Sequence, residues 1–185
     1  MTVLRVVAAW KPLDAVVLGV DPGATSGVAI TVNGKILSSG SCTGQDYVPW
    51  VCRAEKLQVD LQRPLVVAME TWTPHGKWGF KQALSLGEQA GRWLGMIERV
   101  CIDALVVRVE PGEWRRALFG GVLNRPTKVW KDLALMHALA ATDSMCREDE
   151  AEAICMALWA SRSNRVDEEL VRHRRKVRRE RAAQP

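Results

Sequence analysis

The chain has 185 residues, 48% hydrophobic and 25% charged, which is the composition of one globular domain large enough to bury a core. No stretch approaches the roughly eighteen apolar residues of a membrane span, and the first residues lack the arrangement of a signal peptide, so we expect no membrane partner. The five cysteines are scattered, without a C-x-x-C pair, which argues against a disulfide framework or zinc site and favours the cytoplasm.

The net charge of +5 comes entirely from the end of the chain. Residues 1–160 carry equal numbers of basic and acidic side chains, whereas residues 161–185 carry nine Lys and Arg against four Asp and Glu. Basic tails are commonly solvated arms that contact nucleic acid, although many serve only solubility. We therefore divide the chain into a domain over residues 1–160 and a basic, mobile C-terminal tail over residues 161–185.

The first predicted elements lie between residues 16 and 39. Residues 16–20 form a short apolar run that predicts a buried strand, and this run ends in Asp21 and a tight Pro-Gly turn. Residues 28–32 predict a second strand, and Asn33-Gly34 is a strong signal for a hairpin to a third strand over residues 35–39. Residues 1–15 fit either an edge strand or an ordered arm.

A second buried strand that ends in an acid follows a helix. Residues 46–62 predict the helix, Arg63-Pro64 ends it, and residues 65–69 form an apolar run that stops at Glu70. An isolated buried carboxylate is costly, so two strands that each end in one call for a common explanation. A turn or capping role remains an alternative for Asp21.

The middle of the chain alternates turns and helices. Residues 71–80 form a loop rich in aromatic and turn-forming residues, and residues 81–99 predict a helix with a smooth face at Gly87, Gly91 and Gly95. That face fits either packing against the sheet or a dimer interface. A strand over residues 104–109 and a short helix from Pro111 to Gly120 follow.

Two more helices complete the predicted domain. Residues 128–141 predict a helix that buries Val129, Leu133, Met136 and Leu139. The last helix spans residues 147–160; its first turn is acidic and the remainder is almost wholly apolar or small, which predicts burial.

The acidic first turn of the last helix supplies two further carboxylates. Asp149 and Glu152 are three residues apart and therefore share a face. Acids in a first turn also complement the helix dipole, which explains Glu152 less well than its neighbours. If Asp149 and Glu152 lie beside Asp21 and Glu70 in the fold, four carboxylates converge, and their mutual repulsion calls for bound cations. Oxygen ligands suit Mg²⁺ or Mn²⁺, and two such ions can activate water and stabilise the leaving oxygen of a phosphodiester.

Four segments together resemble RuvC-type Holliday-junction resolvases. The run LGVDPG-x-x-x-GVA from Leu18 to Ala29 looks like their first motif, and VVAME, ending at Glu70, resembles their second. Residues 85–91 are similar to the helix segment that follows, and residues 149–157 resemble the closing D-x-x-D-A helix. The resemblance covers about residues 16–160, with all pieces in family order.

The resemblance implies which residues carry catalysis and bind metal. It assigns two Mg²⁺ ions, for which Mn²⁺ substitutes, to Asp21, Glu70, Asp149 and Glu152. Glu152 departs from the family pattern, which more often has Asp there. Further residues are expected to contact DNA, either from the stretch before the last helix, from the loop after Glu70 or from the tail: Arg115, Lys128, Trp72, Lys77, Trp78, Phe80, Arg174 and Arg175. For Lys128, an ordinary exposed helix lysine is an equal alternative.

The fold that the resemblance implies is an RNase H-like α/β fold, a mixed five-stranded sheet flanked by helices, with the first three strands antiparallel. The implied function is a structure-selective endodeoxyribonuclease that acts on four-way DNA junctions as a homodimer, each protomer cutting one strand without a covalent intermediate. Two alternatives remain. One is a catalytically inactive DNA-binding or scaffold protein of the same fold, and the other is a phosphate-loop kinase or ATPase of the actin-like type.

Overall fold

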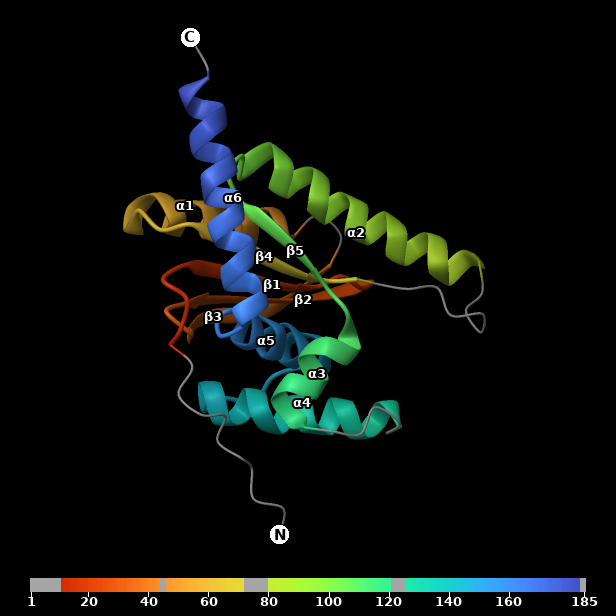
Figure 1. Ribbon diagram of the computed structural model, residues 1–185. Helices are drawn as coiled ribbons and strands as arrows, with labels where there is room; N and C mark the ends of the chain where they lie inside the picture. The colour runs from red at the N-terminus through yellow and green to blue at the C-terminus, as the bar shows by residue number, and fades with distance from the viewer. Residues whose placement is uncertain (1–10, 44–45, 72–79, 121–125, 184–185) are drawn as a thin grey trace.

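The computed structural model describes residues 11–43, 46–71, 80–120 and 126–183 (Figure 1). These residues form a five-stranded sheet in the order β3-β2-β1-β4-β5. The strands are β1 (Val16–Asp21), β2 (Thr25–Val32), β3 (Lys35–Thr43), β4 (Leu65–Glu70) and β5 (Leu105–Val109). The pairs β1–β2 and β2–β3 are antiparallel, and β1–β4 and β4–β5 are parallel, which confirms the predicted mixed sheet.

The predicted hairpin is confirmed between β2 and β3. Asn33 and Gly34 both have positive φ angles, 54° and 70°, as a two-residue turn of type I′ requires. Before β1, residues 11–15 form no strand, but Leu13 is buried and its N–H donates to the Ser161 carbonyl at 2.8 Å. The part of residues 1–15 that is described is therefore an ordered arm.

Helices cover both faces of the sheet (Figure 1). They are α1 (Val48–Leu61), α2 (Phe80–Val100), α3 (Pro111–Phe119), α4 (Thr127–Thr142), α5 (Glu148–Ala160) and α6 (Asn164–Ala182). Successive side chains of a strand point to opposite faces, so Leu18 packs under α1 and α2 while Val17 packs on the α5 side. Within the described segments, no helix is long and apolar enough to cross a membrane.

Helix α5 lies unusually close to the sheet because two glycines face it. A Cβ on Gly27 would lie 1.8 Å from the Asp149 carbonyl oxygen, and a Cβ on Gly19 would lie 2.6 Å from the Ala153 carbonyl oxygen. Gly27 pairs with Asp21 in the β1–β2 register. The first turn of α5 is therefore held directly beside the end of β1.

The structure corrects the buried faces of two helices. On α4 the buried residues are Trp130, Ala134 and Ala138, whereas Met136 and Leu139 are 64% and 42% exposed. The small side chains of Ala134 and Ala138 face inward because α4 packs against α5. On α2 the three glycines of the smooth face are exposed, and a Cβ at any of them would have nothing within 4 Å. Packing of that face against the sheet is therefore wrong.

The expectation of a mobile basic tail is wrong for residues 164–182, which form α6. The Ser163 hydroxyl caps this helix by accepting from the Val166 N–H. Val166 and Leu170 are buried in the same core as α5. Two apolar side chains one turn apart thus hold the start of a helix that otherwise carries mostly charged residues.

We predict that Gly27→Ala destabilises the protein, because the added methyl would overlap the backbone of Asp149. Overpacking against backbone typically costs about 1–3 kcal/mol, so the free energy of unfolding measured in urea should fall by that amount. The control is Asp132→Ala, an exposed position on α4, which should change the free energy of unfolding by less than about 0.5 kcal/mol. Equal effects of the two changes would contradict the close approach of α5.

Candidate active site

Four carboxylates come together at the carboxyl ends of β1 and β4. The two strands are parallel neighbours with Val20 opposite Met69, so Asp21 and Glu70, the next residues, end at the same edge of the sheet. The first turn of α5, held there by Gly27, brings Asp149 and Glu152. The sheet register and one glycine contact therefore assemble acids that are far apart in the sequence.

The charges of these four acids act on one another. The pKa of Asp21 is raised well above its ordinary value, first by burial and then by the negative charges of Glu70, Glu152 and Asp149. Among the described residues, the charge of Arg115 acts in the opposite direction and lowers the pKa of this carboxyl. Asp21 therefore lies at the point where the repulsion among the four carboxylates is concentrated.

Glu70 has a different environment from Asp21. Burial and the charge of Glu152 raise its pKa to about 7, although Arg115 and a hydrogen bond from Trp114 lower it. The Trp114 indole Nε1 donates to Glu70 Oε2 at 3.1 Å. Because Trp114 is itself fully buried, this contact fixes the orientation of the Glu70 carboxyl. Sequence reasoning missed Trp114, whose only signal is its place next to Arg115.

Arg115 brings a positive charge into the cluster from α3. Its Nη2 donates to Glu152 Oε1 at 2.8 Å, and the two side chains are only 19% and 11% exposed. The guanidinium also lies 5.0 Å from the centre of the Trp114 ring. Its Nε is buried and has no hydrogen-bond partner among the described residues. Arg115 thus neutralises one of the four acids and keeps one donor free.

The other two acids of the first turn of α5 face outward from the cluster. Ser39 Oγ donates to Glu150 Oε1 at 2.7 Å, and Lys131 Nζ donates to Glu148 Oε2 at 2.5 Å. The pKa of Lys131 is raised by this hydrogen bond and further by the charges of Glu148, Glu152 and Asp21, although burial opposes the rise. Lys131 is therefore a second positive charge within range of the cluster, and nothing in its helical sequence context distinguishes it.

The chemistry of the cluster fits a divalent cation. All of its ligands would be carboxylate oxygens, which Mg²⁺ and Mn²⁺ prefer, and Asp149 Oδ2 is buried without a hydrogen-bond partner in the described part of the chain. As they lie, no three His, Cys, Asp or Glu among the described residues are arranged as ready metal ligands. Asp21, Glu70, Asp149 and Glu152 are the residues that would hold such a cation.

The remaining residues expected to contact DNA are more dispersed. Lys128 is exposed in the first turn of α4, and Phe80 is the first residue of α2. Arg174 and Arg175 are exposed on α6, about 100° apart around the helix. Three other residues that are expected to contact DNA lie outside the described residues: Trp72, Lys77 and Trp78.

Comparisons with known proteins identify the fold. A scan of protein-family models and a search of curated protein sequences return no match. Among solved structures, the chain is similar to Thermus thermophilus RuvC, with 19% identity, a TM-score of 0.58, and coverage of 82% of this chain and 96% of that one. T. thermophilus RuvC in complex with a Holliday junction substrate gives 17% identity, a TM-score of 0.56, and coverage of 78% and 90%.

A third similar structure is the yeast mitochondrial Holliday junction resolvase Ydc2, with 14% identity, a TM-score of 0.46, and coverage of 93% of this chain and 86% of that one. With the sheet order and the helical layers, the likeness to RuvC shows a RuvC-like, RNase H-like α/β fold. This confirms the predicted fold class.

We predict that, without added metal, the free energy of unfolding falls as the pH rises from 4.5 to about 7. A carboxyl whose pKa is raised by folding holds more protons in the folded state, so its deprotonation over this interval favours unfolding. Glu70→Gln should remove this contribution, which amounts to at most roughly 3 kcal/mol. Urea unfolding between pH 5 and 8 in EDTA measures it. The exposed Glu98→Gln is the control, and identical pH dependence of both variants would contradict the site geometry.

Proposed function

We propose that this chain is a RuvC-type, metal-dependent endodeoxyribonuclease that resolves four-way DNA junctions by paired strand cuts. The observation that carries the proposal is the convergence of Asp21, Glu70, Asp149 and Glu152 at one edge of an RNase H-like sheet. The RuvC fold, one example of which was solved with a Holliday junction substrate, supports a branched-DNA substrate. All five cysteines are free thiols, which fits our proposal of a cytoplasmic location.

The charge balance of the site favours metal binding. Four carboxylates meet two basic side chains, Arg115 and Lys131, so full ionisation leaves an excess of negative charge. Burial and this excess of negative charge raise the pKa values of Asp21 and Glu70, and a bound cation would offset the same repulsion. Two Mg²⁺ ions, or Mn²⁺ in their place, would be held by the four acids and would supply water activation and stabilisation of the leaving oxygen.

The chain's own residues prepare this chemistry. Trp114 holds one oxygen of Glu70 and leaves the other available, and burial of the cluster strengthens every charge interaction in it. Arg115, whose Nη2 donates to Glu152, would keep a fixed positive charge beside the cluster that favours an approaching phosphate. Lys131, bound to Glu148, would place a second positive charge near the same phosphate.

Other predicted DNA contacts remain proposals. Lys128 lies on the same helix as Lys131, one turn earlier, and Phe80 begins the helix that follows the loop of Trp72, Lys77 and Trp78. One aromatic ring of that loop would stack on a base of the opened junction. The basic residues of α6, Arg174 and Arg175 among them, would contact phosphates away from the branch point.

We predict that purified protein cuts a labelled synthetic junction only with Mg²⁺ or Mn²⁺ and that Asp21→Asn or Glu70→Gln abolishes cutting. Binding should persist or tighten, because each change removes negative charge close to phosphate. Glu152→Asp should retain more activity than Glu152→Gln, since only the carboxylate can bind metal. Gel assays of cutting, with anisotropy measurements of binding in EDTA, test both points.

The matched control is Glu150→Gln, which changes an acid of the same helical turn that Ser39 holds outside the cluster and should leave cutting unchanged. Near wild-type cutting by Asp21→Asn would overturn the active-site proposal. Junction binding by the wild type without any cutting would instead favour the inactive scaffold.

We also propose a homodimer, because two symmetric cuts in a junction call for two-fold protein symmetry. The exposed glycines of α2, beside Leu84 at 61% exposure, form the candidate interface. Gly91→Arg should convert the dimer to a monomer in light scattering while circular dichroism shows an intact fold, since in the single chain its side chain enters open space among the described residues. A wild-type protein that is monomeric at micromolar concentration, with and without junction, would refute the dimer.

A further inference from the structure

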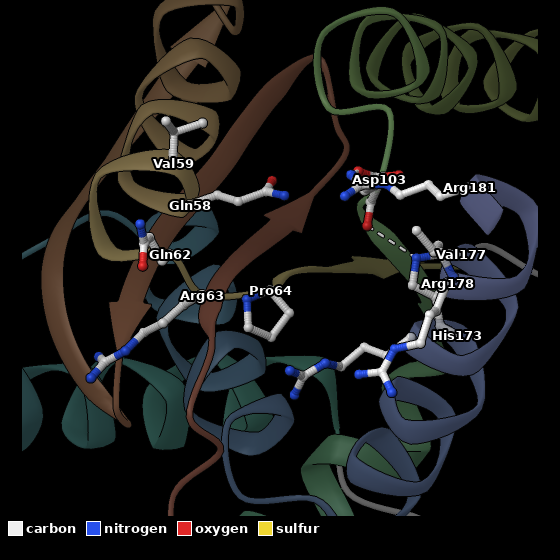
Figure 2. Close-up of a pocket in the computed structure, with 11 residues that line it drawn as sticks. Gln58, Val59, Gln62, Arg63, Pro64, Asp103, His173, Val177, Arg178 and Arg181 are labelled. Atoms are coloured by element: carbon white, nitrogen blue, oxygen red, sulfur yellow. Dashed lines mark hydrogen bonds and ion pairs between the residues drawn. The ribbon is translucent and has the colours of Figure 1, made fainter. Parts of the chain in front are cut away.

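A basic cavity of about 540 Å³, whose lining residues are shown in Figure 2, lies beside the start of β4. The four carboxylates lie at the opposite end of the sheet. The cavity is open to solvent and is lined by the end of α1, the start of β4, the loop before β5 and one face of α6. Pro64 lines it immediately before β4, and Glu70 ends β4, so the cavity and the acids are separated by a six-residue strand, about 20 Å. Its polar lining includes Gln58, Gln62, Arg63, Arg174, Arg178 and Arg181.

Two of the four arginines in this cavity have no partner among the residues that the structure describes. Arg63 is bonded to Asp14 and Asn33, and Arg181 is paired with Asp103. Arg174 and Arg178 are exposed and form no ion pair or hydrogen bond with any described residue. They are four residues apart on one helix, so they lie on the same face with a separation of about 6 Å along the axis.

The cavity is built on fixed elements. His173 Nε2 lies 3.0 Å from the Asp103 carbonyl oxygen, a contact drawn as a dashed line in Figure 2. This contact and the Arg181–Asp103 ion pair hold α6 against the loop before β5, and the buried Val166 and Leu170 hold its start. Arg174 and Arg178 therefore project from a helix that is anchored at both ends.

The lining selects an anion with several phosphate groups. Asp14 neutralises Arg63 and Asp103 neutralises Arg181, so Arg174 and Arg178 carry the excess positive charge, and guanidinium forks bind phosphate oxygens in pairs. On the neighbouring face of α6, Arg175 and Arg179 likewise have no partner among the described residues. Unpaired positive charge thus continues along the helix beyond the cavity, which fits a polymer of phosphates better than one small ligand.

We propose that this cavity binds backbone phosphates of one duplex arm of the substrate, through Arg174 and Arg178, about six base pairs from the scissile phosphate. The spacing follows from the length of β4 and the rise of about 3.4 Å per base pair. The inference rests on the proposed function and adds to it a phosphate site remote from the cut. The inference also gives Arg174 and Arg175 different roles, because Arg174 lines the cavity and Arg175 does not.

The test compares two double variants of equal charge. Arg174→Ala/Arg178→Ala removes the pair inside the cavity, and Arg53→Ala/Arg108→Ala removes an exposed pair outside it, on α1 and β5. Junction binding is measured by anisotropy in EDTA, where no cutting occurs. The cavity pair should weaken binding on the order of tenfold at 0.1 M salt and reduce the salt slope by about 1.8, and the outer pair should have a clearly smaller effect.

A second arm of the test changes the DNA. In this junction, neutral methylphosphonates replace the phosphates five to seven base pairs from the branch point. On this DNA the cavity variant should bind as well as the wild type, because the contacts are already lost. The proposal would be overturned if both double variants lost the same junction affinity. It would also be overturned if the cavity variant lost as much affinity for the neutral DNA as for the unmodified junction. Circular dichroism and melting temperature verify that both variants fold.

Pyrophosphate titration distinguishes a small phosphorylated ligand from DNA. If pyrophosphate binds with micromolar Kd and only Arg174→Ala/Arg178→Ala abolishes this binding, while junction affinity is unchanged, the cavity serves a free ligand and the DNA assignment is overturned. Because these measurements read binding alone, they do not depend on cutting. An Asp21→Asn variant that still cuts would refute the nuclease proposal without affecting these binding results. Failure of the nuclease proposal can therefore be told apart from failure of the phosphate-site proposal.

Discussion

The contact between Gly27 and the backbone of Asp149 is the constraint on which the candidate site depends. A side chain of any size at residue 27 would push the first turn of α5 away from the sheet. Asp149 and Glu152 would then move away from Asp21, which pairs with Gly27 across the hairpin. The acids are thus brought together by backbone packing and not by any attraction among themselves.

This packing destabilises the protein electrostatically, because it places four carboxylates close together. The residues of α5 from Ala151 to Ala160 are all buried, and the energy of that burial holds the carboxylates together against their repulsion. The protein lowers the repulsion with the guanidinium of Arg115 and with protons, as the raised pKa values of Asp21 and Glu70 show. A site that is strained without cations is a common feature of functional sites and lowers stability.

The sequence was sufficient to predict the strands, the hairpin and the acidic ends of β1 and β4, because each is a local signal in a short run of residues. It did not predict the buried face of α4, since this helix carries apolar side chains on two faces and α5 selects the one with Ala134 and Ala138. The charge of the tail concealed Val166 and Leu170, which anchor α6. Trp114 and Lys131 reach the site through contacts between distant segments, which no local pattern encodes.

The two ends of the sheet carry opposite charge, and this gives a phosphate polymer a preferred orientation. The carboxylate end repels phosphate until cations are present, whereas the basic end with Arg174 and Arg178 attracts it at once. Affinity is therefore expected to reside mainly at the end of the sheet that carries out no chemistry. On the proposed function, Asp21 and its neighbouring acids would hold cations that offset this repulsion. Separate binding and cutting ends would then let removal of a carboxylate abolish cutting and still strengthen binding.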